Sequence, residues 1–426
     1  MNKARPKRGW ALQSALPCIA GCDTHKTKSG LRLDFSAGGG KCLINQRKVY
    51  NKQLMIPSAK DKTLFTPGPL TTSLDVKQAM LRDAGSWHFE FNAKVQAIRE
   101  TILDLAGVSQ AAGFECILLQ GSGTFGVESV FSTAVPQEGK VLVLANGAYG
   151  ERMIVMLECL RIDHVVLRTA EDVTPGPQVV AETLEKDPGI SHVAMVHCET
   201  TTGILNPIEA IGHVTRKAGR TFIVDAMSSF GGMPIDFERC GIDFLITSAN
   251  KCLEGVPGFS IVLARRTSLE ANPSMPRCLS LDLMAQLKGF EKNGQFRYSP
   301  PTHSLLAFER ALHELEMEGG IQARGNRYRA NHEALMEGMK GLGFHSYLPP
   351  ETQSYLITSF HYPDDPTFTF DAFYRQLSDR GMIIYPGKIS QVDLFRIGSI
   401  GRIFVSDVQA LVGAIGATLN DLQISL

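Results

Sequence analysis

The chain has 426 residues, of which 44% are hydrophobic, so it can bury a large core and is long enough for two domains. No apolar stretch reaches the roughly 18 residues of a membrane span. The formal net charge is zero, but residues 1–54 carry 11 Lys and Arg against two Asp, which leaves the rest of the chain acidic. An acidic body is unsuited to binding nucleic acid through phosphate contacts, so we expect neither a nucleic-acid nor a membrane partner.

Cysteine and histidine usage bears on compartment and metals. The nine cysteines are scattered without CxxC spacing, and the 11 histidines show no pairing with carboxylates at metal-ligand spacing. In a chain of this length such cysteines are expected to be reduced thiols, which favours a cytoplasmic protein. No metal site is predicted.

Residues 1–60 differ from the rest, because they are basic, rich in Gly and Ser, and lack a helical or strand period. We expect a poorly ordered extension that is dispensable for chemistry. Residues 1–54 could be an organellar presequence, which would change the compartment, or could precede a true start at Met55. A nucleic-acid-binding arm is the least favoured interpretation.

From residue 115 apolar runs alternate with helical patterns, which predicts an α/β fold with a mainly parallel, seven-stranded sheet covered by helices. The strands are expected at 115–120, 141–145, 164–167, 192–197, 221–225, 243–247 and 259–264. Helices are expected at 125–135, 151–160, 176–186 and 207–218.

After about residue 303 the pattern changes to long helices and short strands. Helices are expected at 304–318, 328–339, 370–380 and 406–422, and strands at 355–360, 382–385 and 394–397. This pattern is typical of a smaller α+β domain. We therefore expect a large ligand-binding domain over 61–303 and, over 304–426, a linking helix with a small C-terminal domain.

Asp225 and Lys251 follow two successive predicted strands. Asp225 closes the run 221–225, and Lys251 comes 26 positions later, just after the strand 243–247. The carboxyl ends of parallel strands face one crevice, where such sheets bind ligands. A lysine amine can form a Schiff base with pyridoxal 5′-phosphate (PLP), and a carboxylate can keep the ring nitrogen protonated. The pair therefore suits PLP chemistry, although it is a weak signal when taken alone.

A glycine-rich turn, Gly121-Ser122-Gly123-Thr124, lies where a predicted strand gives way to a helix. Free backbone N–H groups, the positive end of the helix dipole and two hydroxyls could hold a phosphate. The alternative is a tight turn with a Ser or Thr cap. A nicotinamide-binding fingerprint is only approximated, because no acid follows at the expected distance.

Three further positions are candidates for contacts with a ligand. Tyr149 lies between two glycines after a strand and could stack on a planar ring, or pack on the surface of a turn. The hydroxyls of residues 200–202 could bind a phenolic or carbonyl oxygen, or belong to an ordinary turn before Pro207. Arg396 lies in a short apolar strand and must pair with an anion, either an internal carboxylate or a substrate.

Eight segments, taken together and in order, resemble class V aminotransferases of PLP fold type I, most closely the branch that uses 2-aminoethylphosphonate and pyruvate. These segments are 64–73, 120–124, 146–152, 197–203, 224–232, 249–259, 301–303 and 395–401. The resemblance covers about 62–424 and omits the first 60 residues.

The resemblance implies a role for each candidate. Lys251 would carry PLP and move the proton, and Asp225 would pair with the ring nitrogen. Arg396 would bind the carboxylate of pyruvate or alanine, with the phosphonate in the same region. The cofactor-binding residues would be Ser122, Gly123 and Thr124 for the phosphate, Tyr149 on the ring, Thr200 at the phenolic oxygen, Asn250, and Thr302 contributed by the other subunit of a homodimer.

The activity implied is transfer of the amino group of 2-aminoethylphosphonate to pyruvate, giving phosphonoacetaldehyde and L-alanine, in phosphonate degradation. An alanine or serine–glyoxylate aminotransferase is the main alternative, because the same scaffold and arginine suit it. A cysteine desulfurase is excluded, because no cysteine lies between Cys278 and Arg396. A non-catalytic relative of the fold is disfavoured by the presence of both Lys251 and Asp225.

Overall fold

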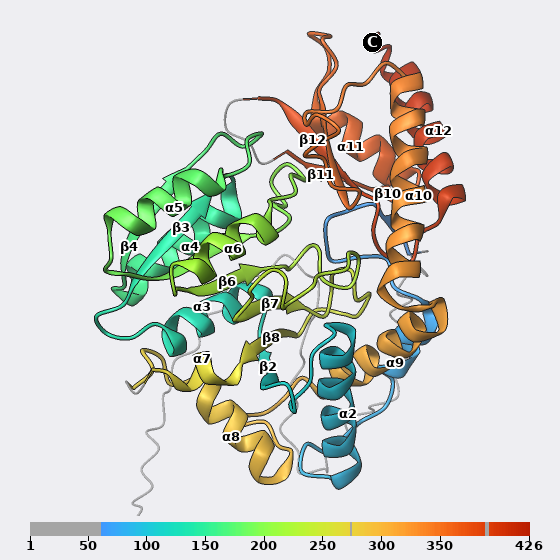
Figure 1. Cartoon of the computed structure of the whole chain (residues 1–426). Helices are drawn as coiled ribbons and strands as arrows, with labels where there is room; N and C mark the ends of the chain where they lie inside the picture. The colour runs from blue at the N-terminus through green and yellow to red at the C-terminus, as the bar shows by residue number, and fades with distance from the viewer. Residues whose placement is uncertain (1–60, 273–274, 388–391) are drawn as a thin grey trace, which may run out of the picture. The chain divides into compact units, whose positions relative to one another are not determined.

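A seven-stranded sheet lies at the centre of the larger part of the fold (Figure 1). The computed structural model describes residues 61–272, 275–387 and 392–426, so the expectations for residues 1–60 lie outside it. The strands, in chain order, are β2 (Phe114–Gln120), β3 (Lys140–Ala145), β4 (Asp163–Arg168), β5 (Ile190–Val196), β6 (Thr221–Asp225), β7 (Phe244–Ser248) and β8 (Phe259–Arg265). All seven predicted strands are confirmed, each within two residues of its expected bounds.

The spatial order of these strands is β2-β8-β7-β6-β5-β3-β4. β8 is antiparallel to both of its neighbours, and the other neighbouring pairs are parallel, which confirms a mainly parallel sheet. The carboxyl ends of β2, β3, β5, β6 and β7 therefore meet at one edge of the sheet, as the sequence predicts.

Helices connect the strands and cover the sheet. α3 (Gly123–Ala134) packs against β7 and β8, and α4 (Ala148–Leu160) packs against β3. α5 (Pro177–Lys186) and α6 (Ile208–Lys217) follow β4 and β5. α3 and α4 begin two and three residues earlier than expected, because glycines near their starts occupy helical positions. Their N-termini consequently lie directly beside the carboxyl ends of β2 and β3.

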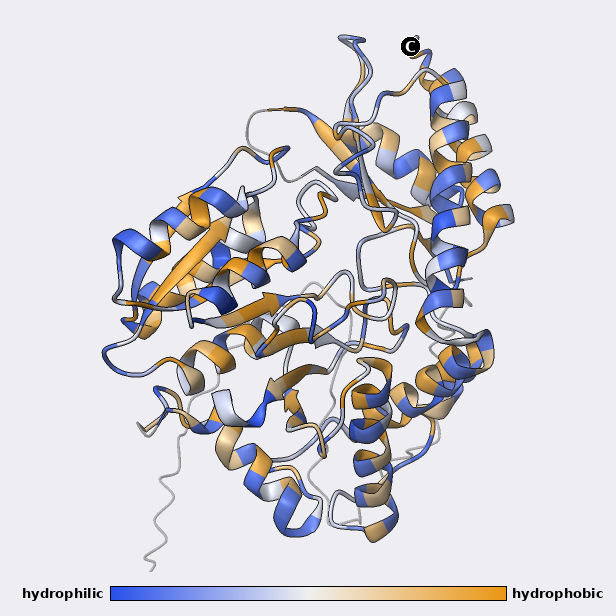
Figure 2. Ribbon diagram, in the orientation of Figure 1, coloured by the Kyte–Doolittle hydropathy of each residue, from blue (hydrophilic) through white to orange (hydrophobic). Residues whose placement is uncertain are grey.

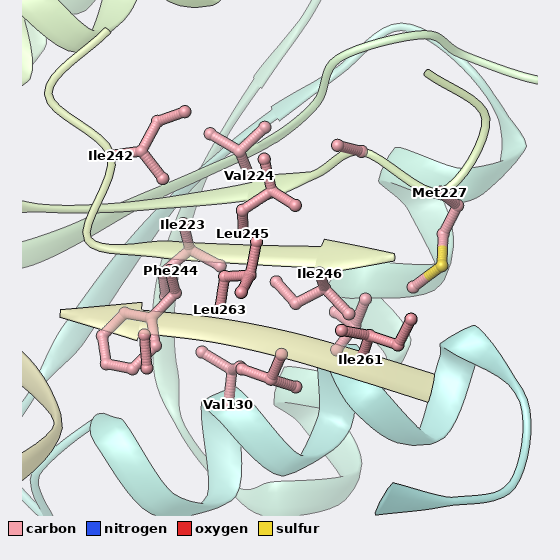
Figure 3. Packing of buried hydrophobic residues seen from close by; sticks show 14 of the residues in the cluster. Val130, Ile223, Val224, Met227, Ile242, Phe244, Leu245, Ile246, Ile261 and Leu263 are labelled. Carbon is pink, nitrogen blue, oxygen red and sulfur yellow. The ribbon is translucent and has the colours of Figure 1, made fainter. Parts of the chain in front are cut away.

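The core forms where these helices meet the sheet. Figure 2 shows that the central strands are hydrophobic, whereas the helices carry hydrophilic residues as well. Figure 3 shows Val130 of α3 close to the side chains of β7 and β8, with Met227 at one end of the cluster. Val130, Leu245 and Leu263 are fully buried, and each such side chain stabilises the fold by about 1.5–3 kcal/mol. The strand ends that bear polar residues are thus mounted on a tightly packed support.

The C-terminal part contains a three-stranded antiparallel sheet, in the order β11-β12-β9, and long helices. This arrangement confirms the smaller α+β part of the predicted fold. Its elements are α9 (Thr302–Glu318), α10 (Gly320–Gly341), β9 (Ile357–His361), α11 (Phe370–Asp379), β10 (Met382–Ile383), β11 (Tyr385–Pro386), β12 (Leu394–Gly398) and α12 (Val405–Leu422). α10 begins eight residues before its expected start, because glycines at 319, 320 and 325 obscure the helical pattern.

Five elements near residues 61–105 and after β8 were not predicted. They are β1 (Thr63–Leu64), α1 (Leu74–Ala79), α2 (Phe89–Leu105), α7 (Arg266–Glu270) and α8 (Leu283–Asn293). β1 pairs with β10, so the start of the described chain lies beside its C-terminal part. In the stretches that the structure describes, no helix combines the length and apolar character needed to cross a membrane.

Hydrogen bonds join the loop after β5 to the small sheet. The Ser359 hydroxyl on β9 donates to the carbonyl of Thr202 at 2.9 Å. Arg396 on β12 donates from Nη1 to the carbonyl of Thr200 at 2.7 Å. The small sheet is therefore held against the edge where the candidate residues gather.

Candidate active site

A cavity of about 180 Å³ opens at the carboxyl ends of the parallel strands. It brings together eight of the ten candidate residues, which come from five separate strand ends. Those eight residues are Ser122, Gly123, Thr124, Tyr149, Thr200, Asp225, Asn250 and Lys251. The remaining two candidates, Thr302 and Arg396, do not line the cavity.

Lys251 lies in a tight turn after β7. The turn is closed by hydrogen bonds from Glu254 N to the Lys251 carbonyl at 2.7 Å and from Gly255 N to the Ala249 carbonyl at 2.8 Å. Lys251 Nζ donates to the carbonyl of Pro67, on the segment that leads from β1. Gly68 leaves room for this side chain, because a Cβ there would lie 2.6 Å from Lys251 Cδ.

The environment of Lys251 makes its amine a better base than an exposed lysine. Burial lowers the pKa of Lys251 to about 8, because a charged ammonium is poorly solvated there, and the positive charge of Arg396 acts in the same direction. A lysine with this pKa is partly unprotonated near neutral pH. It can therefore act as a nucleophile and as a proton acceptor.

Asp225 is the last residue of β6 and is only 5% exposed. Its Oδ1 accepts a hydrogen bond of 2.9 Å from the backbone N–H of Met227, and Oδ2 has no hydrogen-bond partner among the described residues. Burial raises the pKa of Asp225 to about 7. A buried carboxylate in this state gains from a cationic partner in the cavity, such as a protonated ring nitrogen.

The start of α3 presents an anion-binding surface to the cavity. Ser122 is the N-cap residue, yet its hydroxyl makes no capping hydrogen bond. The N–H groups of Gly123 and Thr124 have no acceptor among the described residues, as at an open helix N-terminus. A Cβ at position 123 would lie 2.2 Å from Met227 Sδ, so a larger residue here would have to displace the Met227 side chain. This arrangement matches a phosphate cradle more closely than an ordinary capped turn.

Tyr149 and Thr200 also line the cavity. The Tyr149 ring is packed against the Arg152 guanidinium, whose Cζ is 4.6 Å from the ring centroid. Arg152 Nη1 also donates to the Thr124 hydroxyl at 3.1 Å. Thr200 is buried, and its hydroxyl shares a 2.7 Å hydrogen bond with Ser228. A planar ligand with a ring oxygen would meet an aromatic face and a hydroxyl here.

Arg396 lies behind Thr200, on β12. It is 5% exposed, and Nε donates to the carbonyl of Pro386 at 3.0 Å. Within the described part of the chain no carboxylate lies at ion-pair distance from its guanidinium, so the alternative of an internal salt bridge fails there. Burial lowers the pKa of Arg396, because the charged guanidinium is poorly solvated there. The group is suited to an anion supplied from outside.

Thr302 is the first residue of α9 and lies outside the cavity of the single chain. Its hydroxyl is 3.5 Å from Nδ1 of His303. The single chain therefore does not place Thr302 among the residues that line the cavity.

Six residues that line the cavity were not predicted as site residues, and neither was Glu199, which is buried beside it; the six are Val127, Arg152, Met153, Met156, Met227 and Ser248. Arg152 lies three positions after Tyr149, so helical spacing could have placed both on one face of α4. Met227 and Ser248 carry no sequence signal of their own, although both line the cavity. Glu199 is fully buried beside the cavity. It directly precedes three threonines, and the sequence pattern predicts a ligand contact for their hydroxyls but not for the carboxylate.

These residues fit the binding of PLP. The open helix start with its free hydroxyl suits the phosphate, Asp225 Oδ2 is available for the ring nitrogen, and Lys251 can reach the same space. Among the residues that are described, no three His, Cys, Asp or Glu side chains lie together as a potential metal site. The fold and the cavity together define a PLP-dependent transferase.

Comparison with known proteins agrees with this definition. Residues 71–389 match the family model for class-V aminotransferases. The chain is 51% identical over 352 residues to the 2-aminoethylphosphonate–pyruvate transaminase of Syntrophobacter fumaroxidans, covering 82% of this chain and 94% of the relative. It is 48% identical to the enzyme of that name from Salmonella paratyphi B, over 84% and 98% of the two chains. The chain belongs to the class-V aminotransferase family.

Solved structures share the fold. The alanine–glyoxylate aminotransferase from Nostoc superposes with a TM-score of 0.80 at 24% identity, covering 88% of this chain and 98% of that one. The pyridoxamine-pyruvate aminotransferase from Mesorhizobium loti superposes with a TM-score of 0.78, also at 24% identity, covering 87% and 95%. At this identity the likeness shows the fold alone.

Proposed function

We propose that the chain is a PLP-dependent transaminase that moves the amino group of 2-aminoethylphosphonate to pyruvate, giving phosphonoacetaldehyde and L-alanine. One structural observation carries the transaminase part: Lys251, Asp225 and the open start of α3 face a single cavity. The substrate pair is supported by relatives at 48–51% identity that bear this name and match over more than four fifths of the chain. Such an enzyme makes the phosphonate available for degradation.

Bound PLP supplies a carbonyl that takes up the amino group and a ring that stabilises negative charge at the reacting carbon. Lys251 Nζ would hold this group and, once released from it, would carry a proton between the substrate carbon and the cofactor. Burial already lowers the pKa of Lys251 to about 8, so the free amine is available as a base. The carbonyl of Pro67 accepts from Nζ and orients it.

Asp225 would keep the ring nitrogen protonated through its free oxygen. The hydrogen bond from the Met227 N–H to Oδ1 fixes the orientation of the carboxylate at the end of β6, so Oδ2 is held in one position and is free to accept from a ligand. Pairing with a cation would lower the pKa of Asp225 from about 7 and keep the carboxylate charged during turnover.

Two arginines without a carboxylate partner in the described chain would serve the anionic groups. Arg152 hydrogen bonds to Thr124 beside the phosphate cradle. Arg396 stands on the other side, behind Thr200, and would bind the carboxylate of pyruvate or alanine. We propose that the phosphonate of the amine donor occupies this same anion site in the other half of the reaction.

The site would be completed in a homodimer, in which Thr302 of one chain approaches the phosphate cradle of the other. This assembly is supported by the position of Thr302 at a half-buried helix start, where it does not line the cavity of its own chain. A cytoplasmic location is supported by the six cysteines of the described residues, which are all free thiols.

The alternative within the family is an aminotransferase that uses glyoxylate with alanine or serine. The relatives near 50% identity favour the phosphonate donor, whereas the alanine–glyoxylate structure shares the fold alone. The test is an amine-donor panel in which 2-aminoethylphosphonate, serine and taurine are compared with pyruvate as acceptor, and alanine and serine are assayed in parallel with glyoxylate. A kcat/KM for 2-aminoethylphosphonate with pyruvate far above the others supports the proposal, and a preference for serine, or for alanine or serine with glyoxylate, refutes it.

A further inference from the structure

Glu199 is a fully buried carboxylate that faces the start of α4. It lies in the loop after β5, between Cys198 and Thr200. Its Oε2 accepts from the N–H of Gly150 at 3.2 Å, and Oε1 accepts a longer hydrogen bond of 3.4 Å from the N–H of Tyr149. Oε1 also accepts from the hydroxyl of Thr201 at 2.6 Å and from its backbone N–H at 3.1 Å.

The start of α4 has no cap of its own. The N-cap residue is Gly147, which has no side chain to bind the first N–H groups. Thr201 Oγ1 accepts from Ala148 N at 2.8 Å, so three successive N–H groups are bound by one distant loop. A Cβ at residue 147 would lie 2.4 Å from Glu199 Cγ, which shows how closely the carboxylate approaches the helix. Burial raises the pKa of Glu199, and the hydrogen bonds from Thr201, Gly150 and Tyr149 act in the opposite direction; in its charged form the carboxylate also interacts favourably with the helix dipole.

One of the residues whose N–H group is bound in this way, Tyr149, lines the cavity. Tyr149 is in the first turn of α4, and its backbone N–H is one of the groups that Glu199 holds. Tyr149 lines the cavity proposed for the cofactor, as does Thr200, which follows Glu199 directly. One carboxylate thus links the strand end that supplies the aromatic face to the loop that supplies the ring-oxygen contact.

We infer that Glu199 is a positioning residue, which fixes the Tyr149 ring for stacking on the cofactor by holding the first turn of α4. This inference rests on the proposed role of the cavity as a PLP site, but not on the identity of the amine donor. Two other roles compete with it. Glu199 could stabilise the fold without acting on Tyr149, or its charge could act directly on Asp225.

The test measures PLP binding to the cofactor-free protein, so it does not depend on turnover. Glu199→Gln keeps the shape but places an amide –NH2 opposite the N–H of Gly150 or Tyr149. We expect it to weaken PLP affinity on the order of 10-fold and to reduce the visible circular dichroism of the bound cofactor. Glu199→Ala should weaken PLP affinity at least as much if the variant folds. If it does not fold, the isosteric Gln variant alone provides the test.

A double-mutant cycle separates the three roles. In a Tyr149→Leu background, Glu199→Gln should change PLP affinity by less than about 2-fold, because the group it positions is gone. An equal loss in both backgrounds would overturn the inference in favour of a general structural role. A shift in the pH dependence of PLP binding that persists without Tyr149 would also overturn it, in favour of a direct action on Asp225.

Glu151→Gln is the matched control. Glu151 is also in the first turn of α4, but its carboxylate pairs with Arg168 at 2.7 Å. The Glu151→Gln substitution replaces a carboxylate with an amide at the same helix end, and we expect it to change PLP affinity by less than about 2-fold. A loss equal to that of Glu199→Gln would contradict the specific hydrogen bonds. Failure of the wild-type protein to bind PLP would instead refute the proposed function.

Discussion

Arg396 Nη1 donates a 2.7 Å hydrogen bond to the backbone carbonyl of Thr200. This hydrogen bond joins the small sheet to the loop after β5, in which Thr200 lines the cavity. It therefore links the arginine proposed to bind substrate with the threonine proposed to contact the ring oxygen. The guanidinium makes two hydrogen bonds to backbone carbonyls, from Nη1 to Thr200 and from Nε to Pro386, which leaves other N–H donors for a ligand. No carboxylate of the described residues lies at ion-pair distance from it. The residue is anchored and still able to receive an anion.

Replacing Arg396 should therefore affect substrate binding far more than cofactor retention. We expect Arg396→Met to raise the KM for pyruvate by about 10- to 100-fold, since a charge-assisted hydrogen bond contributes about 1.5–3 kcal/mol. PLP affinity should change by less than about 3-fold. Arg396→Lys keeps the charge but loses the planar guanidinium, so its KM for pyruvate should lie between those of the wild type and the Met variant. Steady-state kinetics decide the matter, and an unchanged KM in the Met variant would place the anion site elsewhere.

Asp225 predicts a particular pH dependence for the cofactor-free protein. Its folded-state pKa of about 7 lies above its ordinary value of 3.8, so the folded chain binds more protons between these values. Stability from this group is therefore lost as pH rises from about 4 to 7. Asp225→Asn removes the titration, so the variant should gain stability relative to wild type by a few kcal/mol across this window.

Urea unfolding of both cofactor-free proteins at pH 5 and pH 8 measures that difference. It should be larger at pH 8 than at pH 5. With PLP bound the wild-type protein should instead be the more stable of the two, because Asn cannot pair with a protonated ring nitrogen. A stability difference that does not vary with pH would show that the buried carboxyl is already compensated within the chain.

Gly123 tests the phosphate cradle. A Cβ at this position would lie 2.2 Å from Met227 Sδ, so Gly123→Ala must displace Met227 or shift the start of α3. We expect about a 10-fold loss of PLP affinity, measured by titration of the cofactor-free protein. Met227→Ala provides the control, because the double variant has space for the added methyl group. Should the double variant bind no better than Gly123→Ala, the clash is not the cause.

Glu254 belongs to a buried charge network behind the Lys251 turn. Its Oε1 accepts from Arg327 Nη2 at 2.7 Å and from the Tyr328 hydroxyl at 2.6 Å. Glu254→Gln removes one of two carboxylates that balance two largely buried arginines, leaving Glu318 alone to pair with them, and should destabilise the protein by about 3–5 kcal/mol. Glu209→Gln breaks an exposed 2.6 Å pair with Arg239 and should lower stability by less than about 1 kcal/mol. Equal losses in urea unfolding would contradict the importance of burial.

The sequence predicts the sheet well because its strands are buried on both faces and read as uninterrupted apolar runs. The direction of β8 was beyond prediction, since nothing in Phe259–Arg265 distinguishes an antiparallel strand from a parallel one. α1 and α2 were missed, because they carry exposed apolar residues such as Leu74 and Phe89 that blur the helical period.

The site was predictable where a residue type carries its chemistry at a strand end. Lys251, Asp225 and the glycine-rich turn stand out for that reason, and the parallel topology brings them into one cavity. Glu199 could not be recognised in this way, because its partners are backbone N–H groups about 50 positions away. Arg152 was hidden by the early start of α4, which depends on a cap supplied from elsewhere in the fold.

The central claim, that Lys251 carries the cofactor, is tested most directly by reductive trapping. The protein is incubated with PLP, reduced with borohydride, digested and mapped by mass spectrometry, with Lys251→Ala as the control. The account predicts one modified peptide, carrying the added mass on Lys251, and no stoichiometric labelling of a well-folded, inactive Lys251→Ala variant. Labelling at another lysine in the wild-type protein, or normal transamination by the variant, would contradict it.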